Sequence, residues 1–253
     1  MTPVDVAHRQ SDFRVRLEWG PAGAAAITRG ADVAVVVDVL SFSTTVTVAL
    51  SRGITVHPVQ WRDDRAVELA RELDANLALQ RQDAPLRPGS VSLSPLSLQR
   101  ATGIERLVLP SPNGATICAE LAGRGVRVVA GCLRNAEAVA AYLADELERG
   151  ATVAVVPAGE RWPDGSMRVA VEDLWGAGAV LAGLDPGLLS PEAELARLAY
   201  GGFVDRPLEH LLACASGREL VAKGFEPDVV IAGRVNTCDV VPRLRDGAFT
   251  PVP

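Results

Sequence analysis

The chain has 253 residues, of which 48% are hydrophobic and 22% are charged, as is ordinary for a globular protein with a sizeable core. Its net charge of −6 argues against a nucleic-acid groove, which needs a basic face, although a bound divalent cation would still permit an anionic substrate. The N-terminus lacks the apolar segment of a signal peptide, and the best candidate for a membrane span, 31–50, carries two aspartates that a bilayer would penalise. We therefore predict a cytoplasmic protein that binds neither membranes nor nucleic acid.

Apolar runs of four to eight residues alternate with helical patterns along the chain. The runs predict strands at 13–19, 33–38, 54–59, 106–109, 126–130, 152–157 and 228–232. The helical patterns predict helices at 44–51, 62–74, 113–123, 135–149, 170–183, 191–200 and 207–222. Because several strand runs are continuously apolar, the sheet is expected to carry helices on both faces. We predict a single three-layer α/β domain over residues 1–253, with the Pro- and Ser-rich stretch 81–100 as an internal loop.

Polar residues follow four of the predicted strands, and ligands of open α/β sheets bind beyond the carboxyl ends of strands. At the first of these ends, Asp38 terminates a valine-rich run, and Ser41, Ser43 and Thr44 follow it. A buried carboxylate is costly without a partner, so Asp38 is a candidate metal ligand. Hydroxyls at a helix N-terminus suit a phosphate, and the alternative for Ser43 and Thr44 is helix capping.

The second and third strand ends carry weaker signals for anion binding. Asn113, Gly114 and Thr116 lie in a turn before a predicted helix, where they could hold an anion. Arg134 is a candidate anion contact, and Asn135 fits the cap of the next helix. In both segments an ordinary turn with a helix cap remains the alternative.

The fourth strand end adds further carboxylates. Glu160 and Arg161 directly follow a strand, and Glu172 and Asp173 begin a helix. The helix dipole alone favours acidic residues at that position, so the pair has a structural alternative. Its place after a long loop, with Glu160 upstream, favours a functional role.

Other signatures point away from other chemistries. The four cysteines have no Cys-x-x-Cys spacing, which predicts reduced thiols rather than a zinc or redox site. Cys118 and Arg124 have the Cys-x5-Arg spacing of cysteine-dependent phosphatases, but they lie in a predicted helix instead of a glycine-rich loop. The motifs GxxxxGK[ST], GxGxxG and GxSxG do not occur.

Four segments, taken in order, resemble the motifs of one family, the 2-phosphosulfolactate phosphatases (the ComB-like family). They are DVLSFSTT, SPNGAT, GCLRNAEAVA and VEDLWGAGAV, and the stretch SLSPLSL is similar to a further loop of the family. The resemblance covers roughly residues 15–245. It implies an α/β/α fold with two intertwined repeats, magnesium-dependent hydrolysis of a small acidic phosphomonoester, and a role in coenzyme M biosynthesis.

The chain departs from the family pattern at two places. Ser41 stands where the family usually has an arginine, which removes a candidate cation for phosphate or sulfonate. The segment LALQRQDAP lacks the Gly-Glu pair that the family usually has there. Arg161 or Arg134 is a candidate replacement for the missing cation.

We predict a phosphatase that uses Mg²⁺ held by Asp38 and Asp173, with Glu172 as a third catalytic residue. The predicted contacts of the small anionic substrate are Ser41, Ser43, Thr44, Asn113, Gly114, Thr116, Asn135, Arg134, Glu160 and Arg161. Whether Asp38 is nucleophile, base or only metal ligand stays open, and a homodimer is one option for the assembly. The alternatives are a non-catalytic family member that binds a phosphorylated or carboxylated metabolite, and a purely structural protein.

Overall fold

A large mixed sheet forms the centre of the protein, whose structure is a computed structural model describing residues 6–83 and 90–252. Its strands are β1 (Val15–Leu17), β2 (Val33–Val37), β3 (Thr55–Val59), β4 (Asn76–Leu77), β5 (Arg106–Pro110), β6 (Arg127–Gly131), β7 (Val153–Pro157), β10 (Pro242–Arg245) and β11 (Ala248–Pro251). Their order in the sheet is β1-β7-β2-β6-β10-β11-β3-β5-β4. A separate small hairpin pairs β8 (Glu160–Arg161) with β9 (Met167–Arg168).

Two groups of parallel strands meet at a hairpin in the middle of this sheet. The strands β1, β7, β2 and β6 pair in parallel, as do β3, β5 and β4. The hairpin β10–β11 lies between the groups and pairs antiparallel to β6 on one side and to β3 on the other. The two groups of the sheet are therefore joined through the last strands of the chain.

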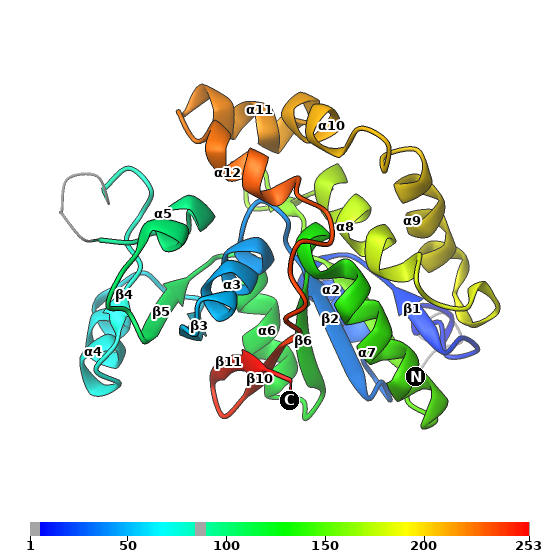
Figure 1. Cartoon of the computed structure of the whole chain (residues 1–253). Helices are drawn as coiled ribbons and strands as arrows, with labels where there is room; N and C mark the ends of the chain where they lie inside the picture. The colour runs from blue at the N-terminus through cyan, green and yellow to red at the C-terminus, as the bar shows by residue number, and fades with distance from the viewer. Residues whose placement is uncertain (1–5, 84–89, 253) are drawn as a thin grey trace.

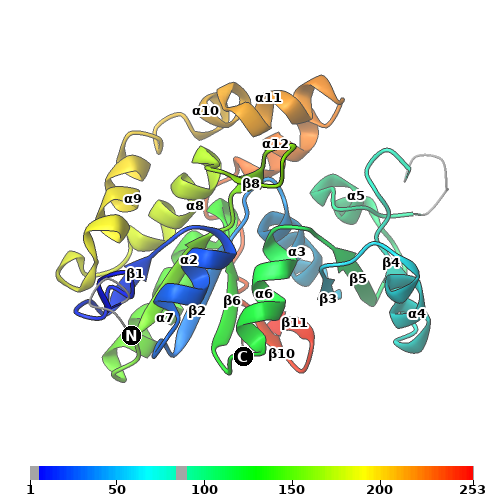
Figure 2. The same cartoon turned by 180° about the vertical axis from the view of Figure 1, so that it is seen from behind.

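Helices cover both faces of the sheet (Figure 1, and from behind in Figure 2). They are α2 (Gly20–Ile27), α3 (Phe42–Ser51), α4 (Asp64–Glu72), α5 (Pro95–Arg100), α6 (Gly114–Ala122), α7 (Ala136–Glu148), α8 (Val171–Leu181), α9 (Pro191–Gly201), α10 (Pro207–Ala213), α11 (Ala215–Ala222) and α12 (Glu226–Ala232), with short 3-10 turns at Leu133–Asn135 and Pro186–Leu188. One apolar cluster joins the sheet to α7, α8 and α9, and a second joins it to α2, α3 and α6.

The central strand β2 shows why the sequence builds this arrangement. All five of its residues are buried, and β-branched valine suits a strand covered on both faces. Val33, Val35 and Val37 belong to the first apolar cluster, whereas Ala34 and Val36 belong to the second, as alternation along a strand requires. The predicted three-layer α/β/α fold is confirmed, while the two intertwined repeats and the single domain over 1–253 stay predictions.

The structure corrects the sequence reading in the last third of the chain. The strand predicted at 228–232 is wrong, because these residues lie in α12 (Glu226–Ala232). Pro227 in the first turn, with Glu226 and Asp228 at the positive end of the helix dipole, favours a helix start over a strand. The helix predicted at 207–222 is split into α10 and α11 at Cys214.

The stretch 81–100, predicted to be a loop, is partly helical. Its last residues form α5 (Pro95–Arg100), and Ser94 caps this helix by accepting the amide of Ser97. Part of the stretch, 84–89, falls outside the described residues. Within the described residues, none of the helices is both long and apolar enough to cross a membrane.

Candidate functional site

Asp38 lies where the chain leaves the buried strand β2, and its side chain is only 7% exposed. Its Oδ1 accepts the amide of Phe42 (3.0 Å), and its Oδ2 accepts the amide of Gly114 (3.1 Å). A Cβ at position 114 would clash with the Phe42 ring and lie 2.9 Å from Asp38 Oδ2, so a glycine is needed there. The carboxylate therefore links the starts of α3 and α6.

Asp173, in the first turn of α8, reaches the same strand exit from the other side. Its Oδ1 accepts the amide of Val39 (2.7 Å), and its Oδ2 accepts the amide of Gly159 (2.9 Å). Asp173 thus holds the residue next to Asp38 and ties the end of β2 to the turn after β7. The structure brings these two sequence-predicted carboxylates, 135 positions apart, to one place.

Two glutamates complete what we call the acidic centre, defined as Asp38, Glu160, Glu172 and Asp173. Glu172 is 2% exposed, and its Oε2 has no hydrogen-bond partner within the described residues. Glu160 accepts a hydrogen bond from the side-chain amide of Asn113 (2.9 Å). The four residues come from the exit of β2, from β8 and from α8, so the fold assembles the acidic centre from segments far apart in the chain.

The electrostatics of the acidic centre follow from burial and mutual repulsion. Burial raises the pKa of Asp38 to about 6, and the charge of Glu172 adds to this. Burial and the charge of Asp38 raise the pKa of Glu160 to about 7. Burial, with the charges of Asp38 and Glu172, raises the pKa of Asp173 well above its usual value. A cluster of this kind needs bound protons or a cation to offset its charge.

The acidic centre suits a hard cation in its donor atoms. Each oxygen of Asp38 and Asp173 accepts one backbone amide and keeps a further lone pair, and Glu172 offers a buried oxygen without a partner. Across residues 6–83 and 90–252, no group of three or more His, Cys, Asp or Glu is arranged to hold a metal ion. The residues fit a cation that takes one or two carboxylates and completes its shell with water and substrate, as Mg²⁺ does.

The hydroxyls after Asp38 are engaged with the main chain. Ser43 Oγ donates to the carbonyl of Val36 (3.1 Å) and accepts the amide of Asp38 (3.0 Å), while Thr44 Oγ1 donates to the carbonyl of Val39 (2.8 Å). Neither side chain caps α3. In this structure both hydroxyls stabilise the exit of β2.

Four other predicted substrate contacts also bond to main-chain groups. Thr116 Oγ1 donates to the carbonyl of Pro112, and the amide of the fully buried Asn135 donates to the carbonyls of Ala130 and Val240. The guanidinium of Arg134, 7% exposed, donates to the carbonyl of Ile231, and that of Arg161 to the carbonyl of Gly165. None of these four residues is among the described residues that line the cavity of about 470 Å³ beside the acidic centre.

Ser41 contacts a cation that the sequence analysis did not single out. Arg81 Nη2 donates to Ser41 Oγ (2.5 Å), and Arg81 Nε donates to Asp228 Oδ2 (3.1 Å). Asp228 is 1% exposed and also accepts the hydroxyl of Ser94 (2.5 Å). The only sequence signal for Arg81 was its place in the segment that departs from the family pattern.

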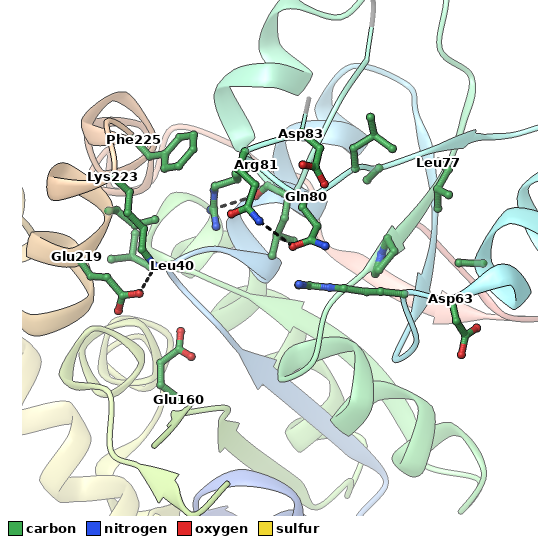
Figure 3. A pocket seen from close by; sticks show the side chains of 18 of the residues that line it. Leu40, Asp63, Leu77, Gln80, Arg81, Asp83, Glu160, Glu219, Lys223 and Phe225 are labelled. Atoms are coloured by element: carbon green, nitrogen blue, oxygen red, sulfur yellow. Dashed lines mark hydrogen bonds and ion pairs between the residues drawn. The ribbon is translucent and has the colours of Figure 1, made fainter. Parts of the chain in front are cut away.

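A cavity of about 470 Å³ opens beside the acidic centre (Figure 3). Glu160 and Leu40 line it near the strand ends, and α11 and the segment around β4 form other parts of its wall. Figure 3 shows Glu160 on the side of the cavity opposite Gln80 and Arg81. The volume is that of a small-molecule site.

A mixed α/β fold with carboxylates gathered beside a polar cavity is typical of enzymes that bind small ligands at strand ends. Residues 24–247 match the family model described as 2-phosphosulpholactate phosphatase, and the chain belongs to this family, whose name denotes phosphoric monoester hydrolases. The family predicted from the sequence motifs is confirmed.

Curated relatives span nearly the whole chain. A protein of Methanothermobacter thermautotrophicus named "2-phosphosulfolactate phosphatase" is 32% identical over 86% of this chain and 89% of its own length. Two proteins named "Probable 2-phosphosulfolactate phosphatase" are similar in extent. That of Carboxydothermus hydrogenoformans is 30% identical over 84% of this chain and 87% of its own, and that of Deinococcus radiodurans is 31% identical over 87% and 90%.

Proposed function

We propose that this protein is a magnesium-dependent phosphatase that hydrolyses a small phosphomonoester carrying a further acidic group, with 2-phosphosulfolactate as the first substrate to test. The observation that carries the proposal is the pair of buried carboxylates, Asp38 and Asp173, fixed on both sides of the β2 exit beside the cavity. Family membership supports the same reaction.

In this proposal Asp38 and Asp173 hold Mg²⁺, which when bound supplies positive charge to polarise the phosphoryl group. The amides of Phe42, Gly114, Val39 and Gly159 fix the two carboxylates, so their oxygens need no rearrangement during the reaction. The role of Asp38 beyond binding the metal stays open between nucleophile, base and ligand alone.

Glu160 is the candidate proton carrier. In the metal-free protein, burial and the charge of Asp38 raise its pKa to about 7, so that it holds a proton for part of the time at neutral pH, and it lies on the cavity wall. From there its Oε atoms can give a proton to the leaving alcohol oxygen. The side-chain amide of Asn113 holds the carboxyl group in place.

The proposal places the enzyme in the cytoplasm. If 2-phosphosulfolactate is its substrate, the reaction belongs to coenzyme M biosynthesis. No nucleic-acid partner is expected from a net charge of −6, and a homodimer is one option for the assembly.

The test is phosphate release from a panel of small phosphomonoesters, with Mg²⁺ and with EDTA. Metal-dependent release that Asp38→Asn abolishes, and that Asp205→Asn on the exposed surface leaves intact, would support the proposal. No release from any ester by the folded protein would refute it. The alternative, a non-catalytic binding protein, would then gain support from any panel compound that raises the melting temperature.

A further inference from the structure

Two arginines line the cavity that the acidic centre adjoins, and the proposed chemistry uses neither. Arg62 directly precedes the N-terminal region of α4, and Arg81 follows β4. We call this pair the basic end of the cavity. It lies on segments outside all four motif regions from which the candidate site was predicted.

Arg81 is held in a fixed orientation. Its Nε donates to Asp228, its Nη2 donates to Ser41 Oγ and to the carbonyl of Leu93 (3.2 Å), and its guanidinium lies 5.6 Å from the centre of the Phe225 ring. Among the described residues, Nη1 has no hydrogen-bond partner. A guanidinium fixed on one edge, with donors left on the other, is prepared to bind a carboxylate or sulfonate oxygen.

Arg62 has no ion-pair partner among the described residues, although it lies close to another cation. The surrounding cavity wall lowers its pKa, and so does the positive charge of Arg81. Two guanidinium groups that repel each other across a cavity are stabilised when an anion binds between them. Asp228 pairs with Arg81, and no described carboxylate pairs with Arg62, although Asp63, Asp64 and Asp83 also line this part of the cavity.

The cavity thus has charges of opposite sign on its walls. Glu160 is the residue of the acidic centre that lines the cavity, and this side suits a phosphate. The basic end lines another part of the same cavity of about 470 Å³. A phosphomonoester with no other charge would leave the basic end unused. A substrate with a second acidic group would use both.

We propose that Arg62 and Arg81 bind the second acidic group of the substrate, a carboxylate or a sulfonate, and thereby select polyanionic phosphomonoesters. This rests on the proposed function in that the phosphate is taken to lie at the acidic centre. Arg81 reaches the hydroxyl of Ser41, so the cation absent from position 41 is supplied there by a residue 40 positions along the chain.

The first experiment compares Arg62→Gln with Arg65→Gln. Arg65 lies on the same segment, pairs with Asp63 and does not line the cavity, so it is the matched control. We expect Arg62→Gln to raise the KM for 2-phosphosulfolactate about tenfold. The KM for glycerol 2-phosphate, which has no second acidic group, should stay within about twofold in both variants.

At Arg81 a conservative substitution is required, because removal of the positive charge would leave Asp228 buried without its cation. Arg81→Lys keeps the charge but loses the planar set of donors, and it should raise the same KM several-fold without changing that for glycerol 2-phosphate. An equal rise for both esters, or no rise in either arginine variant, overturns the proposal.

Calorimetric titration with sulfolactate, which lacks the phosphate, separates this proposal from the phosphatase reaction. We expect wild type to bind it about tenfold more tightly than Arg62→Gln. If the protein binds sulfolactate in this way but hydrolyses no ester, the proposed role of Arg62 and Arg81 stands and the proposed phosphatase reaction is refuted. Equal or unmeasurable binding of sulfolactate by the two proteins would refute the proposed role of Arg62 and Arg81, even if phosphate release is observed.

Discussion

The acidic centre and the basic end differ in how their charges are held. The aspartates of the acidic centre are almost completely buried, and backbone amides fix all four of their carboxylate oxygens. In the basic end, Arg81 is fixed chiefly by side chains, and Arg62 is exposed to solvent. We infer that the first region is built for a fixed reaction geometry and the second for selecting among substrates.

The largest expected effect is that of Asp38→Asn. The variant keeps the size of the side chain but loses a charge that would bind Mg²⁺, so we expect kcat to fall at least about a thousandfold. Measurement of phosphate release, beside a circular-dichroism spectrum, checks this. Substantial activity in a folded variant would remove Asp38 from the mechanism and weaken the contrast between the two regions.

Gly114→Ala tests whether the acidic centre depends on close packing. The new methyl group would clash with Phe42 and crowd Asp38 Oδ2, which should cost about 1–3 kcal/mol in the free energy of unfolding. Urea denaturation measures this cost. Gly123→Ala, at the end of the same helix with a negative φ and no close neighbour, is the control and should change stability by less than about 1 kcal/mol.

The pH dependence of stability tests the electrostatics of Glu160. Its folded pKa of about 7 lies above its ordinary value of 4.5, so between these pH values the folded protein binds more protons than the unfolded chain. Glu160 therefore contributes stability that is present below pH 4.5 and is lost as the pH rises through 7. In metal-free buffer, wild type should lose stability relative to Glu160→Gln over this window, as thermal melts at several pH values would show. Parallel curves for the two proteins would argue against a raised pKa.

The smallest expected effect belongs to the basic end. Ser41→Ala removes one hydrogen bond from Arg81 but leaves its pairing with Asp228, so the KM for a polyanionic ester should rise only about two- to fivefold. Steady-state kinetics with 2-phosphosulfolactate measures this. A loss of kcat comparable to that in Asp38→Asn would show that Ser41 belongs functionally to the acidic centre.

The residues of the acidic centre could be picked out from the sequence because each stands at a local boundary. Asp38 ends a valine run, and Glu172 and Asp173 begin a helix, so patterns of a few residues revealed them. Arg81 and Asp228 have no such local mark. Their contact joins positions 147 residues apart, and only the folded chain brings them together.

The same limit explains the mistaken strand at 228–232. Its run of valine and isoleucine has strand propensity, but α12 buries Val229 and Ile231 as a helix against the rest of the molecule. The position of β10 and β11 within the sheet was equally hidden, since neither has a long apolar run. The secondary structure of 228–232 and the positions of β10 and β11 in the sheet depend on long-range packing, which short sequence patterns do not reveal.

The hairpin β10–β11 has a consequence for how the protein is made in the cell. It lies between two groups of parallel strands whose residues are synthesised much earlier, so the sheet cannot close until residues 242–251 have left the ribosome. Until then the inner edges of β6 and β3 are unpaired, a condition that invites association between nascent chains. We therefore expect pairing of this hairpin with β6 and β3 to be a late event in the folding of the sheet.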